Sequence, residues 1–471
     1  MQFVIKDSEG RVGMKSKQEL STLDLKHLVH PAVNFKELQQ RGPRIIVEGK
    51  GTRVKDIDGR EYLDAFSSLW NVVIGHGRES VAKAIAEQLS KLEFYSGWFG
   101  FASPAAIELA AKVISLMPSD WNMGHVLFTC GGSETNDTNI KIARMYWNLM
   151  GKPEKKKIIS RNLAFHGVTY GSMTATGIEF FKLYFDPYAP GFLHVVAPYC
   201  YRCELKLTYP DCGVACANAL EEAILREGPD TVASFIGEPV MGAGGVIVPP
   251  SEYWPMIRKI CDKYDVLLIN DEVLTGFGRT GKMFGLMHWN VRPDLMSIAK
   301  AVTSGYLPLG GAIMSNRVFD GLAENLPDYM PFLHGFTYSN HPVSCAAGLE
   351  VLRIIEEEKL VDNAARMGEY LKARLKGLYD HRSVGDIRST GLMAAVELVG
   401  NKETKEQIGE LPLQAPRRVE ALLWEKGIYA RAIPTESIAI APPFIFTKEE
   451  VDTLVDALDA SIAQMEKELL R

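Results

Sequence analysis

The sequence has few cysteines, no long apolar run and no excess of basic residues. Seven cysteines among 471 residues are too few for a disulfide framework, and their odd number leaves at least one unpaired. No segment reaches the ~18 consecutive apolar residues that cross a membrane. Residues 1–20 also lack the apolar core of a signal peptide. We therefore expect a cytoplasmic protein with no membrane association.

The charge balance is slightly acidic. The formal net charge is −6, so few cationic side chains are in excess to neutralise phosphates, and we do not expect a nucleic-acid partner. Hydrophobic residues make up 46% of the chain and charged residues 23%. This composition is typical of a globular protein and excludes a disordered or fibrous chain.

The length predicts about two to three domains, although no internal repeat or Pro/Gly/Ser-rich linker divides the chain. Up to about residue 74, a helix precedes short strands, with a hairpin expected in Arg53–Leu63 around an Asp-Gly turn. From about residue 79, helices alternate with short apolar runs, which predicts mainly parallel strands buried on both faces. These runs are Val126–Thr129, Lys157–Ser160, Leu193–Ala197, Val232–Ile236, Val266–Asn270, Leu295–Ala299 and Gly311–Ser315.

The last ~140 residues follow a different pattern, that of an α+β unit. A long helical segment near Cys345–Leu375 precedes an antiparallel pair within Val384–Leu398, and a further helix is expected near Ala415–Lys426. We predict an α/β protein whose large domain, with a mainly parallel sheet, spans residues 75–330. Residues 1–74 and 331–471 are expected to form a smaller α+β domain from both ends of the chain.

The first segment with chemical potential joins a strand to a helix through Gly131 and Gly132, with Ser133 following. Glycines let a ligand approach the backbone closely, and free N–H groups at a helix start attract phosphate. No lysine follows the glycines, so the segment is not a nucleotide-binding P-loop. Taken alone, it also fits an ordinary strand–helix turn with a serine cap.

Two further strand ends carry charged residues. Asp271 and Glu272 follow an apolar strand, where buried carboxylates need a cation or a donor. They could equally lie at the exposed edge of the sheet. Lys300 follows the next apolar strand and could reach out to water, but a desolvated amine loses its proton more readily and attacks carbonyl groups.

Together, a phosphate cradle, a strand-end Asp and a strand-end Lys 29 positions later are the parts that hold pyridoxal 5'-phosphate (PLP). The run Leu268–Gly281, which continues to Lys300, resembles the signature of class III PLP-dependent aminotransferases. The order of elements is similar from about Lys26 to the C-terminus. This resemblance implies the fold type I architecture of PLP-dependent transferases.

The resemblance also implies roles for single residues. Lys300 would form the Schiff base with the cofactor and then shuttle a proton, and Asp271 would keep the pyridine nitrogen protonated so that the ring acts as an electron sink. The remaining cofactor contacts are implied for Gly132, Ser133, Phe165, His166, Glu238, Val273 and Thr337. Many relatives carry Tyr at the position of Phe165, so one polar contact is missing. Glu238 also fits a buried structural acid.

Thr337 has a particular implication for assembly. In the family, the matching threonine reaches the phosphate in the neighbouring subunit. The resemblance therefore implies a homodimer with shared active sites, and dimers could pair further into tetramers.

Three residues are candidates for substrate binding. Trp70 and Trp98 match positions where relatives acting on ω-amino acids or amines place aromatic pocket walls, although both also fit ordinary core aromatics. Arg431 matches an arginine that binds the acceptor's carboxylate and swings aside for apolar donors. A guanidinium suits a planar carboxylate because it can bind both oxygens. A plain surface arginine is the alternative.

We therefore expect an enzyme, a homodimeric ω-amino acid or amine transaminase with pyruvate as the acceptor and no metal. Candidate donors are β-alanine, taurine, 4-aminobutyrate, diamines and arylalkyl amines. An aminomutase or amino-acid epimerase on the same scaffold is the first alternative, because Lys300 and Asp271 serve those reactions too. A cofactor-binding protein without catalysis is the second, and retention of the nucleophile argues against it.

Two other patterns of glycines and cysteines occur in the sequence. Residues 241–246 contain three glycines, but Val248-Pro249-Pro250 follows in place of a helix, so a dinucleotide fingerprint is rejected. A second pattern has the spacing C-x2-C…C-x3-C and leaves open a structural metal or a disulfide. Its members are Cys200, Cys203, Cys212 and Cys216.

Overall fold

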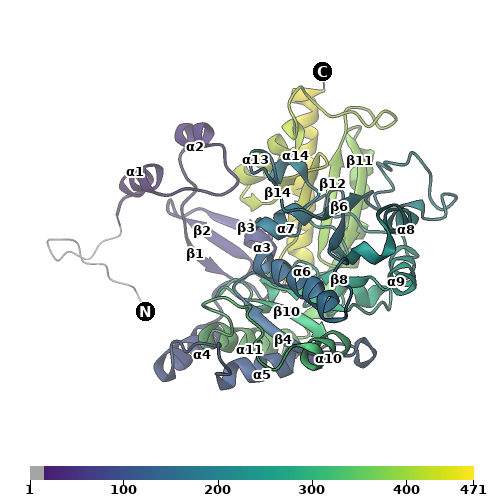
Figure 1. Cartoon of the computed structure of the whole chain (residues 1–471). Coiled ribbons are helices and arrows are strands. Elements are labelled where there is room, and N and C mark those ends of the chain that lie inside the picture. The colour runs from purple at the N-terminus through teal and green to yellow at the C-terminus, as the bar shows by residue number, and fades with distance from the viewer. Residues whose placement is uncertain (1–14, 471) are drawn as a thin grey trace.

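A seven-stranded sheet forms the centre of the molecule (Figure 1). The computed structural model describes residues 15–470. The strand order is β4-β10-β9-β8-β7-β5-β6, and β10 alone runs antiparallel to its neighbours. The strands are β4 (Met123–Thr129), β5 (Lys157–Arg161), β6 (Phe192–Val195), β7 (Val232–Gly237), β8 (Leu267–Asp271), β9 (Leu295–Ile298) and β10 (Gly310–Ser315). All seven expected strands are therefore present.

Helices cover both faces of this sheet, which explains why its strands are almost continuously apolar. Along β8, Leu268 packs into one buried cluster while Leu267 and Ile269 pack into another on the opposite face. The second cluster contains side chains from α6, α7 and α10. The helices between residues 75 and 330 are α4 (Glu79–Lys91), α5 (Pro104–Ser115), α6 (Gly132–Leu149), α7 (Tyr170–Ala175), α8 (Ala215–Glu227), α9 (Tyr253–Lys263) and α10 (Asn316–Asn325).

Two four-stranded sheets complete the molecule, with orders β1-β2-β3-β13 and β11-β12-β15-β14. The first joins the two ends of the chain, because β13 pairs in parallel with β3. The expected hairpin within Arg53–Leu63 is the antiparallel pair β2–β3. These strands are β1 (Ile46–Lys50), β2 (Arg53–Asp56), β3 (Glu61–Asp64), β11 (Val384–Thr390), β12 (Met393–Leu398), β13 (Ile428–Tyr429), β14 (Arg431–Ile433) and β15 (Ser437–Ile440).

One helix expectation is wrong in detail. The long helical segment near Cys345–Leu375 is two helices, separated at Glu358 and Lys359, where Lys359 has a φ of 51°. Four successive charged residues interrupt the apolar spacing there, so the chain turns before the second helix begins. The remaining helices are α1 (Lys17–His27), α2 (Phe35–Arg41), α3 (Ser67–Trp70), α11 (Pro342–Glu357), α12 (Leu360–Leu375), α13 (Gln414–Glu425) and α14 (Lys448–Leu469).

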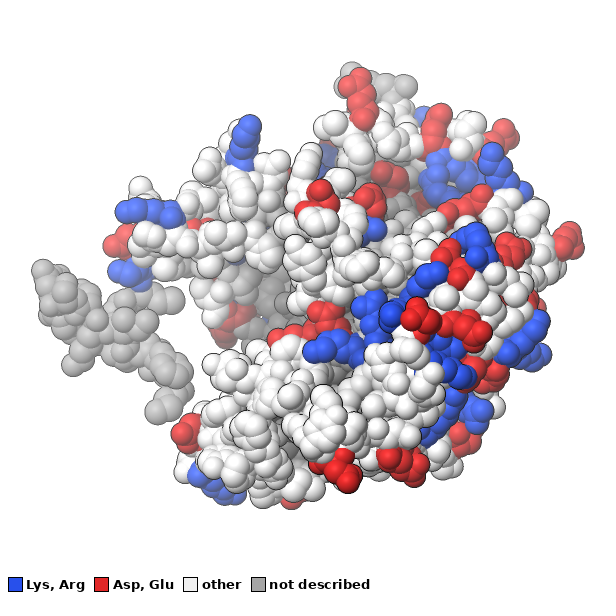
Figure 2. Space-filling model, viewed as in Figure 1, with Lys and Arg blue, Asp and Glu red and all other residues white. Residues whose placement is uncertain are grey.

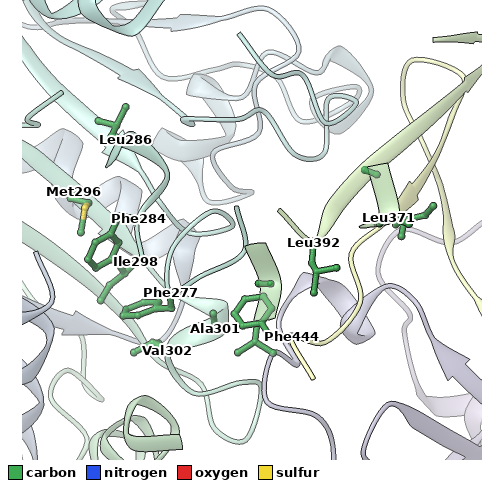
Figure 3. Close-up of a cluster of buried hydrophobic side chains, with 14 of the residues drawn as sticks. Phe277, Phe284, Leu286, Met296, Ile298, Ala301, Val302, Leu371, Leu392 and Phe444 are labelled. Atoms are coloured by element: carbon green, nitrogen blue, oxygen red, sulfur yellow. The ribbon is translucent and has the colours of Figure 1, made fainter. Parts of the chain in front are cut away.

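A buried apolar cluster joins the end of β9 to the C-terminal part of the chain (Figure 3). Ala301 and Val302, directly after β9, lie beside Phe277, and Phe444 packs close to them. A Cβ added to Gly278 would stand 3.1 Å from the Phe444 ring. The turn that carries Lys300 therefore rests on a rigid apolar base shared by distant segments.

Candidate active site

The three predicted strand ends lie at the same region of the central sheet. β8 ends at Asp271, which pairs across the ladder with Ser297 of β9. Lys300 comes three residues later, and β10 separates β9 from β4, whose end leads into the glycine turn. In open α/β sheets, ligands bind outside the carboxyl ends of the strands, so this position suits a ligand site.

Asp271 is buried in a hydrogen-bond network and does not lie at an exposed sheet edge. Its Oδ2 accepts from Asn136 Nδ2 and from His166 Nδ1, each at 2.7 Å. Among the described residues, its Oδ1 accepts from the Val273 amide alone, at 3.1 Å. A carboxylate has further lone pairs, so Oδ1 retains capacity for another donor.

Sequence reasoning missed the residues behind this carboxylate. Asn136 Oδ1 accepts from Ser297 Oγ at 2.6 Å, and that hydroxyl accepts from Asn139 Nδ2 at 2.8 Å. The signal was the helical spacing, because Asn136 lies one turn after Gly132 and faces the same end of the sheet. His166 Nε2 is buried and has no hydrogen-bond partner among the described residues.

Lys300 has the features of a reactive amine. It has a φ of 47°, in a region that only a few per cent of non-glycine residues adopt, and such outliers often mark functional sites. Its side chain is partly enclosed, and Nζ makes no hydrogen bond within residues 15–470. Burial lowers the pKa of Lys300, although the negative charges of Asp271 and Glu238 act in the opposite direction.

The glycine turn leaves the start of α6 open to a ligand. Gly131 is the N-cap and no side chain caps the helix, so a turn capped by Ser133 is not what forms. The amides of Gly132, Ser133 and Glu134 have no acceptor in the described chain. A Cβ on Gly132 would lie 2.8 Å from Val273 Cγ1, so glycine lets Val273 approach the cradle. Ser133 Oγ accepts from the Val168 amide at 3.1 Å.

Glu238 connects two loops around the site. Its two carboxylate oxygens each accept a backbone amide at 3.0 Å, from Phe165 and Gly242. It is buried, and burial raises the pKa of its carboxyl group. Phe165 is partly buried, and its ring meets that of Phe181 edge-on at 4.9 Å. Glu238 therefore fixes the backbone on which Phe165 stands.

The structure places the three substrate candidates on different elements. Trp70 is only 5% exposed and packs edge-on against Phe66, with a ring separation of 4.7 Å. Trp98 donates from Nε1 to the Phe336 carbonyl at 3.0 Å. Arg431, at the start of β14, is 42% exposed and pairs with Glu420 at 3.1 Å.

Thr337 lies outside this group, in a segment without helix or strand between α10 and α11. Its side chain is exposed, and its hydroxyl makes no hydrogen bond with any residue the structure describes. It is therefore free to contact a group that lies beyond this chain.

The four cysteines of the C-x2-C…C-x3-C pattern line one cavity of about 20 Å³. Their thiols are free, as are those of the other three cysteines. Over residues 15–470, no three His, Cys, Asp or Glu side chains are arranged to hold a metal ion.

Such a constellation, with an enclosed amine, a buried carboxylate and an open helix start at adjacent strand ends, defines a PLP-dependent enzyme. The family model for class III aminotransferases matches residues 36–462, so the chain belongs to that family. It is an α/β transaminase of fold type I that uses PLP, with an amine donor and a keto-acid acceptor.

Named relatives extend over nearly the whole chain. A diaminobutyrate–2-oxoglutarate transaminase of Halomonas elongata is 40% identical over 465 residues, which cover 97% of this chain and 98% of that protein. A putrescine–pyruvate aminotransferase of Pseudomonas aeruginosa is 40% identical over 439 residues, with coverages of 93% and 94%. The crystal structure of an (S)-enantioselective omega-transaminase from Thermomicrobium roseum is 44% identical, with a TM-score of 0.92 and coverages of 96% and 100%.

The residues present fit the cofactor. Free amides at the start of α6 suit a phosphate, and Asp271 Oδ1 has room for a protonated ring nitrogen. Lys300 offers an amine without a hydrogen-bond partner among the described residues. Within residues 15–470, the structure has no helix of the length and apolarity needed to span a membrane.

Proposed function

We propose that this enzyme transfers the amino group of an ω-amino acid or amine to pyruvate. The amine of Lys300 carries the proposal, because it is partly enclosed, has no hydrogen-bond partner among the described residues and feels the charge of Asp271. The candidate donors are β-alanine, taurine, 4-aminobutyrate, diamines and arylalkyl amines. The two named relatives act on diaminobutyrate and on the diamine putrescine, which supports the diamine part of this range.

In this proposal each residue has a defined task. PLP, when bound, supplies an electron sink for the charge left on the substrate carbon. Lys300 Nζ would bind the cofactor and, once released by the substrate, would move the proton from that carbon to the cofactor. Asp271 holds the proton on the ring nitrogen, and the Asn136 and His166 donors fix the carboxylate's orientation. Gly132 and Ser133 bind the phosphate, while Val273 and Phe165 enclose the ring.

Substrate recognition falls to three side chains. Arg431 would bind the pyruvate carboxylate through both of its oxygens, since a guanidinium presents a matching pair of donors. In the structure it instead pairs with Glu420, a position it would hold when the donor has no carboxylate. Trp70 and Trp98 would form apolar walls for the donor.

We also propose a cytoplasmic homodimer with shared sites, in which Thr337 reaches the partner's cofactor phosphate. Seven unpaired thiols suit a reducing compartment. Residues 75–330 would form the PLP-binding domain, and residues 1–74 with 331–471 the smaller one, of which residues 1–14 and 471 lie outside the described part.

Absorbance of the cofactor-loaded protein tests this function. A panel of single amines, added without keto acid, should bleach the visible band for the true donors, and pyruvate should restore it with formation of alanine. Lys300→Ala should lower turnover by about 10³-fold or more while the melting temperature and circular dichroism stay unchanged. Near-wild-type rates in Lys300→Ala would exclude the mechanism. Turnover of one amino acid without pyruvate would instead indicate an aminomutase or epimerase.

A further inference from the structure

Residues 326–341, between α10 and α11, form a long connection without helix or strand. Structureless connections of more than about 12–15 residues are uncommon in compact domains and usually have a function. This one exposes Tyr329, Leu333 and Tyr338, and it carries Thr337, whose hydroxyl has no partner in the described chain. Phe332 packs against the buried cluster that includes α6 side chains, whereas the residues after it depend on polar contacts to fix their course.

His334 attaches this connection to helix α6. Its Nε2 lies 2.8 Å from Thr138 Oγ1, and its Nδ1 lies 2.9 Å from Lys141 Nζ. Thr138 and Lys141 are adjacent on one face of α6, three positions apart. The Thr138 hydroxyl also donates to the Glu134 carbonyl at 2.7 Å, within the first turns of that helix.

These contacts allow only one protonation state of the ring. The Lys141 ammonium can only donate, so Nδ1 accepts and carries no proton. The Thr138 hydroxyl has already donated its hydrogen to Glu134, so it accepts from Nε2–H. Burial and the Lys141 charge lower the pKa of His334 to about 4, which keeps the ring neutral and both contacts intact at physiological pH.

A second attachment is made by Phe336, directly before Thr337. Trp98 donates to the Phe336 carbonyl, and Ser339 Oγ accepts from the Phe336 amide at 3.0 Å. The four residues from His334 to Thr337 are therefore held at their N-terminal end by α6 and near their C-terminal end by these two contacts. Removal of the His334 contacts would leave Phe332, two residues before His334, as the nearest attachment of that end.

We propose that His334 is a positioning residue that presents Thr337 to the cofactor phosphate of the neighbouring subunit. Through Thr138 and Glu134 it ties that stretch to the helix whose first turn cradles the phosphate of its own subunit. Each cofactor phosphate would thus be bound by two parts. One is the start of α6 in its own subunit, and the other is the His334–Thr337 stretch of the neighbouring subunit, which is attached to that neighbour's α6. The inference rests on the proposed homodimer with shared sites.

Cofactor affinity is the direct test, measured by absorbance titration of the apoprotein with PLP. His334→Ala should raise the dissociation constant about tenfold, since it removes two hydrogen bonds, one of them to a charged group. Thr138→Val should have a similar effect. His334→Gln should recover most of the affinity, because its amide can donate to Thr138 and accept from Lys141. His125→Gln, in β4, is the matched control and should leave the affinity unchanged.

Mixed dimers show whether the effect crosses between subunits. In a dimer of a wild-type chain and a Lys300→Ala/His334→Ala chain, only the wild-type chain has Lys300. Its site receives Thr337 from the partner, in which His334 is missing. That site should bind PLP about tenfold more weakly than the working site of a dimer that pairs a Lys300→Ala chain with a His334→Ala chain. Equal affinities in the two dimers would overturn the inference.

Two further results separate this inference from the proposed assembly. If Thr337→Val leaves PLP affinity unchanged, or the protein is a monomer, the shared site itself is wrong. If Thr337→Val weakens binding and His334→Ala does not, the shared site holds and the role of His334 is wrong. A fall in the melting temperature of the His334→Ala apoprotein without any change in PLP affinity would reduce His334 to a structural residue.

Discussion

Single side chains set the reactivity of Lys300 through opposing effects. Burial favours the neutral amine, whereas the negative charges of Asp271 and Glu238 favour the ammonium ion. The net result is a lowered pKa, so burial is the larger effect. A neutral amine is the form that attacks a carbonyl group, and the site therefore prepares Lys300 for cofactor binding.

The rate at which apoprotein binds PLP should rise with pH through the lowered pKa of Lys300. Glu238→Gln removes a charge that raises this pKa, so the rising part of the profile should move to lower pH. Stopped-flow absorbance over a pH series measures it. Glu204→Gln, an exposed carboxylate, is the control and should leave the profile in place. A shift to higher pH in Glu238→Gln would contradict the argument.

Arg431→Ala should raise the KM for pyruvate by about 10- to 100-fold, the cost of a lost charge-assisted hydrogen-bond pair. The KM for a monoamine donor should change little, because that donor has no carboxylate. Glu420→Gln should lower the KM for pyruvate, since it releases Arg431 from its ion pair. Steady-state kinetics with both substrates varied would check these effects, and equal changes for both substrates would remove Arg431 from carboxylate recognition.

For single residues, the sequence predicted the site where a charged residue directly follows an apolar strand. Asp271 and Lys300 could be predicted because charged groups at the ends of buried strands are rare and costly. The helical spacing from Gly132 places Asn136 at the same end of the sheet, but the hydrogen-bond partners of Asn136 and Ser297 could not be predicted, since they lie 135 and 161 positions away along the chain. The role of His334 could not be predicted for the same reason, because its partner Thr138 lies 196 positions away along the chain.

Among the elements, α6 and the segment after β8 meet at a contact that only glycine permits. Val273 is β-branched and therefore stiff at χ1, so it cannot turn away from a methyl group placed on Gly132. The two Cγ atoms would lie 2.8 and 3.0 Å from that methyl group. The start of α6 and Val273 are thus coupled sterically.

Gly132→Ala should destabilise the protein by about 1–3 kcal/mol, the usual cost of overpacking, and should weaken PLP binding. The double variant Gly132→Ala/Val273→Ala should recover part of both losses. Gly377→Ala, where an added Cβ meets nothing within 4 Å, is the control. Thermal unfolding and PLP titration measure the two quantities. An unaffected Gly132→Ala variant would show that the turn can relax.

Element order was largely predictable, because apolar runs and turn signals are local. The break between α11 and α12 was missed because α11 ends where Lys359 adopts a positive φ. A lysine rarely adopts this conformation, so its residue type does not predict the break. The role of Gly131 as the α6 cap was missed for a related reason. Serine is a commoner N-cap residue than glycine, whereas α6 begins at Gly131 with no side chain to cap it.

The whole molecule has one face that suits a partner subunit. In Figure 2, charged side chains gather on the right of the view, whereas the lower left, near α4 and α5, is largely uncharged. The connection between these helices and α5 itself expose large apolar side chains, which in contiguous patches mark interaction sites. They are Tyr95, Phe99, Phe101 and Ile107.

Phe99→Asp should turn the proposed dimer into a monomer and reduce PLP affinity. Phe99 is 88% exposed and has a φ of 60°, a conformation that aspartate adopts more readily than phenylalanine, so the change should not strain the backbone. Analytical ultracentrifugation would measure the mass and absorbance titration the affinity. Val47→Asp, another exposed apolar residue in β1, serves as the comparison. A Phe99→Asp variant that stays dimeric would place the interface elsewhere.

The pairing of β3 with β13 has a consequence for biosynthesis. Leu63 leaves the ribosome 365 residues before Ile428, its partner in the parallel ladder. The carbonyls of Ala65 and Val73 likewise accept hydrogen bonds from amides near the C-terminus, those of Ala441 and Phe444. Until then, β3 presents an open edge and an apolar side chain that the finished protein buries. We expect nascent chains to depend on chaperones throughout translation, and prematurely terminated products to be recognised and degraded.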